Sequence, residues 1–172
     1  HEAALERVRG ITNRELQFMN ADIRDTVALD KIFNIFQPEA VIHFAGLKAV
    51  GESVADPLTY YDVNVGGSIS LLSAMSKVEC NTIVFSSSAT VYGDPQYLPY
   101  DEEHPTNPVN PYGRTKLMIE NIIRDWTKVD SKRRGTILRY FNPVGAHESG
   151  QIGEEPIRIP NNLMPYIAQV AD

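Results

Sequence analysis

The chain has 172 residues, of which 42% are hydrophobic and 22% are charged, and its formal net charge is −6. This length is sufficient for one domain with a buried core, and the composition is ordinary for a globular protein. The negative charge argues against nucleic acid as a partner, because phosphate backbones bind clustered lysine and arginine. No run approaches the roughly 18 apolar residues of a membrane span, so we expect no membrane association.

The single cysteine, Cys80, allows no disulfide within these residues. No secretory signal pattern is present at the start, so a cytoplasmic location is the default expectation. The histidines show no metal-ligand spacing, and we expect no metal site. His43 lies in an apolar segment and is expected to be a core residue with a hydrogen-bond partner, not a catalyst.

The first part of the chain alternates between helix and strand patterns. Residues 1–9 resemble the end of a helix that Gly10 closes, and residues 16–19 predict a short strand. Asp25 is a plausible N-cap for a helix that Pro38 stops. Residues 40–44 predict a strand buried on both faces. The helix expected over 25–36 would bury Val27, Leu29, Ile32, Phe33 and Phe36.

The alternation continues to the end of the chain. Helices are expected over 57–78, interrupted by Gly66 and Gly67, over 111–128 and over 161–171. Strands are expected over 82–85 and 136–140. Strands that alternate with helices of this length form parallel βαβ units. The sequence therefore predicts an α/β fold with a doubly wound parallel sheet of the Rossmann-like type.

Unusual residues follow three of the predicted strands, at 44–48, 86–88 and 140–142. Ligands of such sheets bind at the carboxyl ends of the strands. Tyr112 and Lys116 lie one helical turn apart at the start of a helix that begins near the same edge. A Tyr-x-x-x-Lys pair is weak evidence alone, but this convergence favours a site.

Four longer segments carry a family resemblance. They are VIHFAGLKAVGES at 41–53, FSSSATVYG at 85–93, RYFNPVGAH at 139–147 and IPNNLMPY at 159–166. In this order they closely resemble the UDP-glucose (UDP-galactose) 4-epimerases, extended short-chain dehydrogenases/reductases with bound NAD. The resemblance covers nearly the whole chain and implies that its parent interconverts UDP-glucose and UDP-galactose in galactose metabolism.

The resemblance implies a mechanism as well. The sugar C4 carbon loses a hydride to NAD⁺ while its hydroxyl loses a proton to Tyr112, and the ketone takes the hydride back on its other face. We expect Lys116 and the positive nicotinamide to lower the pKa of Tyr112, by about 3 units. Ser88 would pass the proton and Thr90 would contact the sugar. Without the resemblance, Tyr112 could equally be an aromatic core residue at a helix start.

The resemblance also implies contacts to both ligands. Asp22 remains open to reading as a simple turn residue, Lys48 as a surface residue, and Asn142 as a turn before Pro143. The implied cofactor residues are Asp22, Ile23, Phe44, Ala45, Lys48, Asn64, Ser88, Tyr112, Lys116 and Phe141. The implied substrate residues are Ser88, Thr90, Tyr112, Asn142, Asn162 and Leu163.

The glycine-rich turn with which this family cradles the NAD pyrophosphate has no counterpart in the sequence. We therefore expect residues 1–172 to be a partial Rossmann-like domain, incomplete at both ends, with 142–172 leading into the substrate-binding region. By itself this stretch is expected neither to retain NAD nor to epimerise. The alternative is a non-catalytic α/β fragment or interaction module with an exposed sheet edge.

A nucleotide-sugar 4,6-dehydratase shares the fold, NAD and Tyr-x-x-x-Lys, but eliminating water needs an acid and a base near Thr90. The segment Ser88-Ala89-Thr90-Val91 has no carboxylate, which disfavours that alternative. The resemblance further implies a homodimer through helices 57–78 and 111–128. The apolar residues expected to supply its interface are Leu71, Leu72, Met75, Met118, Ile122 and Trp126.

Overall fold

The computed structural model describes residues 2–153, 164, 166–167 and 170, and it divides into two units. One unit consists of residues 21–141, and the other draws on 1–20 and 142–172. No helix among the described residues has both the length and the apolar character needed to cross a membrane.

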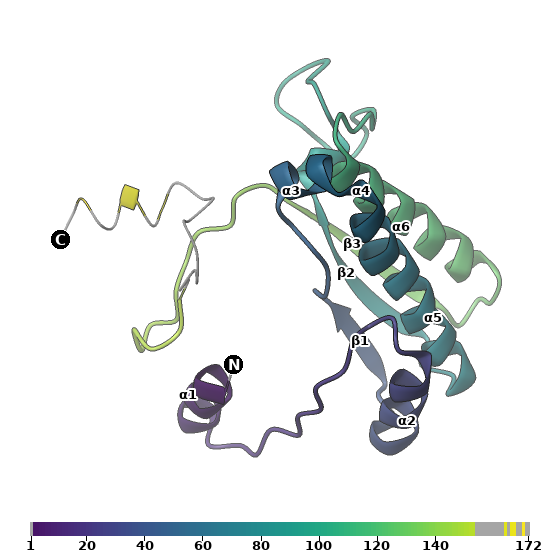
Figure 1. Ribbon diagram of the computed structural model, residues 1–172, viewed down its shortest axis with the longest axis vertical. Helices are drawn as coiled ribbons and strands as arrows, with labels where there is room; N and C mark the ends of the chain where they lie inside the picture. Colours follow the sequence, from purple (N-terminus) through teal and green to yellow (C-terminus); the bar gives the residue numbers. More distant parts are fainter. Residues whose placement is uncertain (1, 154–163, 165, 168–169, 171–172) are drawn as a thin grey trace. The chain divides into compact units, whose positions relative to one another are not determined.

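The unit 21–141 is built on a parallel sheet of three strands (Figure 1). These are β1 (Ala40–His43), β2 (Thr82–Ser88) and β3 (Arg134–Tyr140), with β2 in the centre. Thr82 lies opposite Ala40 on one side and Arg134 on the other. Because parallel neighbours need long crossovers, helices connect each strand to the next. The parallel α/β arrangement expected from the sequence is confirmed.

The helices predicted over 25–36, 57–78 and 111–128 are present, the first of them before β1 and the other two in the crossovers. The helix expected over 57–78 has a π-helical turn in its first half, and a short helix over 50–55 and a 3₁₀ turn over 89–91 were not predicted. The helical elements of this unit are α2 (Thr26–Phe36), α3 (Val50–Ala55), α4 (Pro57–Tyr60), the π-helix η1 (Tyr61–Gly66), α5 (Gly67–Lys77), the 3₁₀ turn η2 (Ala89–Val91) and α6 (Pro111–Lys128).

The core of this unit lies between the sheet and one layer of helices. Ile83 and Phe85 of β2 are buried among side chains of α2, α5 and α6. The opposite face is open: Ile42 is 65% exposed, and Phe44, just after β1, is 64% exposed. The prediction that residues 40–44 are buried on both faces is therefore wrong. Residues 21–141 supply helices to only one face, so they form one half of a doubly wound arrangement.

Helix α2 begins as the sequence predicts. The Asp25 carboxylate accepts hydrogen bonds from the backbone N–H groups of Val27 and Ala28, at 3.0 and 2.9 Å, which satisfies donors that have no partner inside the helix. Leu29 and Phe33 are buried as expected. Val27 is 77% exposed, however, because its position in the first turn faces away from α5 and the sheet.

In the other unit, α1 (Glu2–Thr12) passes through Gly10 and ends before Asn13, whose φ of 50° is left-handed. The prediction that Gly10 closes this helix is wrong, because one glycine costs a helix only about 1 kcal/mol relative to alanine. Residues 16–19 are not a strand, since no described strand pairs with them. The helix expected over 161–171 lies mostly outside the described residues.

Candidate active site

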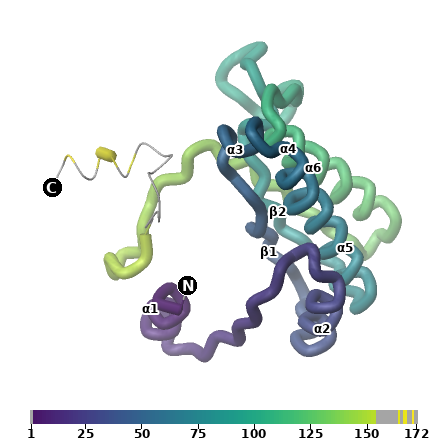
Figure 2. Tube along the Cα trace, viewed as in Figure 1, coloured from purple at the N-terminus to yellow at the C-terminus, as the bar shows by residue number. Residues whose placement is uncertain are grey.

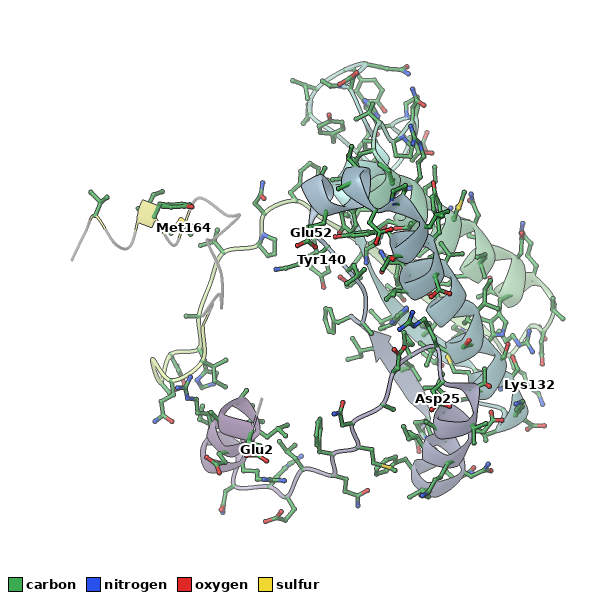
Figure 3. All side chains as sticks on the ribbon, viewed as in Figure 1. Glu2, Asp25, Glu52, Lys132, Tyr140 and Met164 are labelled. Atoms are coloured by element: carbon green, nitrogen blue, oxygen red, sulfur yellow. The ribbon has the colours of Figure 1, made fainter. Side chains whose placement is uncertain are left out.

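The candidate site lies at the carboxyl end of the sheet in the unit 21–141. Figure 3 shows Glu52 of α3 near this end, while Asp25 at the start of α2 lies toward the other. The loop between η2 and α6 extends beyond the same end, beside α3 and α4 (Figure 2). This places the end of β2, the loop after β1 and the start of α6 together, as the sequence predicts.

The start of α6 is anchored by several independent contacts. Asn110 caps it by accepting a hydrogen bond from the Gly113 N–H at 2.8 Å, and Pro111 occupies the first turn. The buried hydroxyl of Ser53 on α3 accepts a hydrogen bond from the Tyr112 N–H at 3.2 Å. A Cβ on Gly113 would lie 2.8 Å from the carbonyl oxygen of Thr90. Glycine therefore lets the helix start approach the end of β2 closely.

Three hydroxyl groups form a chain at this point. The Ser88 Oγ accepts hydrogen bonds from the Thr90 N–H at 3.2 Å and from the Thr90 hydroxyl at 3.0 Å. The Ser88 side chain also lies beside the Tyr112 phenol, where a hydrogen bond from its hydroxyl lowers the pKa of the phenol. Thr90, Ser88 and Tyr112 thus lie in the order that a proton relay requires.

Tyr112 is 9% exposed, and this burial raises the pKa of its phenol. The hydrogen bond from Ser88 lowers the pKa, but by less. Burial penalises the phenolate because the charged form loses hydration. The expectation of a lowered pKa for Tyr112 is not met by the protein groups alone.

Lys116 lies one turn further along α6 and is also buried. Its Nζ donates a hydrogen bond to the carbonyl oxygen of Ser86 at 2.7 Å, and it lies 4.9 Å from the ring centre of Phe85 and 5.8 Å from that of Tyr112. Burial lowers the pKa of Lys116 to about 8. The side chain is therefore still mostly protonated at neutral pH, close to the phenol.

Several predicted cofactor residues are exposed near the carboxyl end of the sheet. Phe44, Ala45 and Lys48, in the loop after β1, are exposed, as is Phe141 after β3. Phe141 stacks on Tyr92 with ring centres 6.4 Å apart. These residues leave surface for a ligand at the ends of adjacent strands, where such sheets bind ligands.

Asn64, another predicted cofactor residue, is instead buried in the π-helical turn. Its side-chain amide donates to the Leu47 carbonyl at 3.0 Å and to the Thr115 hydroxyl at 3.2 Å, and its Oδ1 accepts from the Leu47 N–H at 2.7 Å. Both amide hydrogens are therefore used inside the protein. Asn64 ties the loop after β1 to α6, and a direct contact with the cofactor stays a prediction.

Asp22 and Ile23 lie in the turn before α2. The Asp22 carboxylate accepts hydrogen bonds from Arg24, which lower its pKa to about 2, so it has the turn role that the sequence left open. A Cβ on Gly67 would lie only 2.4 Å from the Ile23 side chain, so glycine allows this turn to pack on α5. Contact of these residues with an adenine stays a prediction.

The remaining predicted substrate residues are Asn142, Asn162 and Leu163. Asn142 is exposed and belongs to the unit that draws on 1–20 and 142–172. Asn162 and Leu163 lie outside the described residues. The structure therefore brings Ser88, Thr90, Tyr112 and Lys116 together. The substrate contacts predicted for the two asparagines and the leucine stay predictions.

Sequence reasoning missed the buried polar residues that support this group. Ser53, Thr115 and Glu120 are each fully buried. Thr115 donates from its hydroxyl to the Tyr112 carbonyl at 2.7 Å. The only signal for Glu120 is its spacing of four residues from Lys116 and eight from Tyr112, which places an acid on the buried face of α6.

His43 is a core residue, as the sequence suggests. It is 3% exposed, and its Nε2 lies 2.9 Å from the Ser68 hydroxyl, which itself donates to the Asn64 carbonyl. Burial, and secondarily the charge of Lys116, lower the pKa of His43 to about 4. Among the described residues, no group of three or more His, Cys, Asp or Glu side chains could hold a metal ion.

Comparisons with known proteins agree on one family. The chain is 57% identical to a UDP-glucose 4-epimerase of Bacillus subtilis over 168 residues and 56% identical to that of Mus musculus over 169, in both cases covering 98% of this chain. These alignments cover 50% and 49% of the relatives. The chain thus spans about half the length of the curated relatives it matches.

Solved structures agree. The UDP-glucose 4-epimerase of Bifidobacterium longum, in complex with NAD⁺ and UDP, superposes with a TM-score of 0.94 at 51% identity, covering 99% of this chain and 51% of that one. The model of the NAD dependent epimerase/dehydratase family matches residues 2–170. This chain therefore belongs to the NAD dependent epimerase/dehydratase family.

Proposed function

We propose that this chain carries the proton-transfer half of a UDP-glucose 4-epimerase, which interconverts UDP-glucose and UDP-galactose with NAD. The observation that carries the proposal is the hydroxyl chain from Thr90 through Ser88 to Tyr112, with the Lys116 ammonium 5.8 Å from the phenol ring. The names of the relatives support the same reaction. Galactose metabolism is the process that this reaction serves.

The proposed reaction removes two hydrogens from the sugar and returns them. Bound NAD⁺ would supply the oxidising chemistry by accepting a hydride from C4 and returning it to the opposite face of the ketone. The phenolate form of Tyr112 takes the proton of the C4 hydroxyl, either directly or through Ser88, and becomes the neutral phenol, which later gives the proton back. A positioned general base of this kind contributes about 10²- to 10⁴-fold to the rate.

The charges near Tyr112 support its role as base. Burial raises the pKa of the phenol, so the protein must stabilise the phenolate to use it at neutral pH. The Ser88 hydroxyl donates to the phenol oxygen, and Lys116 places a positive charge nearby. A cationic nicotinamide would add to both effects.

The residues exposed at the ends of β1 and β3 fit a dinucleotide. Phe44 and Phe141 offer apolar surface to its rings, and Lys48 offers a positive charge to its phosphates. Asp22, Ile23 and Asn64 complete the proposed cofactor set. For the sugar nucleotide we propose contacts from Asn142, Asn162 and Leu163 in addition to Ser88 and Thr90.

We further propose a homodimer through α5 and α6, although its predicted interface needs correction. Leu71 and Met75 are buried in the core and cannot supply it, and Leu72, which is also nearly buried, reaches the surface only as part of the lining of a hollow. The outer side of the two helices instead forms a hollow, beside which Met118 is 44% exposed on α6. The hollow is lined by Ile69, Leu72, Ser73, Ser76, Ile122 and Trp126.

Light scattering tests the dimer. A Met118→Glu substitution should convert a dimer of the full-length protein into monomer at micromolar concentration, because it places a charge in an apolar interface. The matched control is Val27→Glu, at an exposed apolar position of α2 outside the proposed interface. A monomeric unsubstituted protein would contradict the proposal.

A cytoplasmic location, which the single cysteine supports, completes the proposed function.

The decisive test of the activity is an epimerisation assay on the full-length protein, with UDP-galactose, NAD and the Tyr112→Phe variant. The unsubstituted protein should form UDP-glucose, and the variant should lose about 10²- to 10⁴-fold in kcat while retaining NAD. Absence of turnover by the unsubstituted protein would contradict the proposed function. A 4-keto-6-deoxy product would instead indicate a dehydratase.

A further inference from the structure

Glu120 is a fully buried carboxylate on α6 that the proposed chemistry does not use. Its side chain has 0% exposure, and removing a carboxylate from water is costly unless it is paired and hydrogen-bonded. The position follows Tyr112 and Lys116 at intervals of four residues, so all three side chains share one face of the helix. An acid at this position therefore needs a physical reason.

The Glu120 carboxylate joins three elements of the fold. Its Oε1 accepts hydrogen bonds from the Ser87 hydroxyl of β2 at 2.6 Å and from the Arg139 Nε of β3 at 3.0 Å. Its Oε2 accepts from Arg139 Nη2 at 2.8 Å and from Arg124 Nη2 at 2.9 Å. Arg139 is itself mostly buried, with 14% of its side chain exposed. The pair is bidentate, which is the strongest geometry for arginine and carboxylate.

The carboxylate is ionised in this setting. Burial alone would raise the pKa of Glu120, but the hydrogen bonds from Arg139 and Ser87, together with the positive charge of Arg139, lower it below the ordinary value. Charge-assisted bonds of this kind are about twice as strong as neutral ones. The interaction therefore remains intact throughout the neutral range.

The partner in β2 is the residue between two members of the candidate site. The carbonyl oxygen of Ser86 accepts a hydrogen bond from the Lys116 ammonium. The Ser88 hydroxyl forms a hydrogen bond with the Tyr112 phenol. Ser87, which lies between them, donates to Glu120. Three consecutive residues of the central strand thus contact three successive turns of α6. The hydrogen bond between Ser87 and Glu120 holds α6 against β2 in a fixed position. In that position Lys116 reaches the Ser86 carbonyl and Tyr112 reaches Ser88.

We propose that Glu120 is a positioning residue, which locks α6 to β2 and β3 so that Tyr112 and Lys116 stay aligned with Ser88 and Ser86. This proposal rests on the proposed epimerase function. Replacing the carboxylate would let α6 move along the strand and withdraw the ammonium from the phenol. A displacement of about 1 Å at a catalytic group can cost on the order of 10²-fold in rate.

The test uses the full-length protein with a Glu120→Gln substitution, which keeps the shape and removes the charge. We expect kcat to fall about 10- to 100-fold while KM for the UDP-sugar stays within about threefold. The acidic limb of the kcat profile should move to higher pH, because the phenolate loses support from Lys116. The control is Asp125→Asn, an exposed carboxylate on the same helix, which should change neither quantity.

A merely structural role would give a different result. A folded Glu120→Gln protein with a lower Tm but an unchanged kcat and pH profile would overturn the proposal. If this variant fails to fold, the test uses Ser87→Ala, which removes one hydrogen bond to Glu120. Its kcat and its pH profile are then compared with those of the unsubstituted protein. Unchanged kinetics in that variant would overturn the proposal as well.

A second readout separates this proposal from the proposed function. Tyrosine labelled with ¹³C at Cζ reports the pKa of Tyr112 by NMR, with the signal assigned from Tyr112→Phe. A higher Tyr112 pKa in Glu120→Gln or Ser87→Ala supports the positioning role even if the unsubstituted protein turns over no UDP-sugar. An unchanged Tyr112 pKa in folded variants contradicts it.

Discussion

The Lys116 ammonium donates a hydrogen bond to the backbone carbonyl of Ser86 at 2.7 Å. This contact fixes a positive charge near the end of β2, two residues before Ser88, whose hydroxyl accepts a hydrogen bond from Thr90, and beside the Tyr112 ring. Because Ser86 contributes its carbonyl, not its side chain, the identity of that residue in the sequence does not reveal the contact. The position of the end of β2 therefore decides where the positive charge of Lys116 lies.

The charge on Lys116 should make the activity fall at alkaline pH. Burial lowers the pKa of Lys116 to about 8, and only the protonated form, present below that pH, supports a phenolate. We expect kcat/KM to decline as pH rises through about 8. Lys116→Met should lose about 10²-fold in kcat and lack this limb, whereas Lys77→Met, an exposed control, should keep it. An alkaline limb that survives in Lys116→Met would contradict the assignment.

Ser88 should matter more than its partner Thr90 for proton transfer. Ser88→Ala removes the hydroxyl that donates to Tyr112 and should lower kcat by roughly 10-fold or more. Thr90→Val removes only the donor to Ser88 and should have a smaller effect on kcat. Steady-state kinetics with UDP-galactose measures both. Equal losses would show that the two hydroxyl groups act as one unit.

Gly113 should be required for the close approach of α6 to the end of β2. A Cβ at this position would lie 2.8 Å from the Thr90 carbonyl oxygen and 2.9 Å from the Pro108 side chain. We expect Gly113→Ala to displace the helix start, lower kcat about 10-fold and reduce Tm. Gly51→Ala on α3 meets nothing within 4 Å and should leave both unchanged. Thermal unfolding and kinetics on the two variants decide the point.

His43 should make the protein less stable in acid. Its pKa is about 4 in the folded protein against 6.5 for an ordinary histidine. The unfolded chain therefore binds the extra proton first, and stability is complete above pH 6.5 and declines as the pH falls toward about 4. The difference corresponds to roughly 3 kcal/mol.

Chemical denaturation at several pH values measures this contribution. In His43→Gln, which keeps a donor for Ser68, the free energy of unfolding should depend less on pH in this window. His147→Gln, at an exposed position, should retain the dependence of the unsubstituted protein. An identical pH dependence in His43→Gln would show that another group controls acid unfolding.

Much of the fold was predictable because it depends on local patterns. The Asp25 cap, the apolar periodicity of α2 and the alternation of strand and helix act over a few residues, so they are visible in the sequence. The pairing of Tyr112 with Ser88 followed from a family resemblance together with the rule that ligands bind at strand ends. The expected strand at 16–19 failed, because a strand needs a partner that local sequence does not specify.

The sequence by itself determined the parallel α/β class and the helix that carries Tyr112 and Lys116. Only the tertiary structure decided what Asn64, Ser53 and Glu120 do, because each of them bonds to a residue from a distant segment. The tertiary structure also decided the pKa values. A buried phenol, ammonium or imidazole is tuned by the removal of water and by neighbouring charges, which depend on packing in space and not on order along the chain.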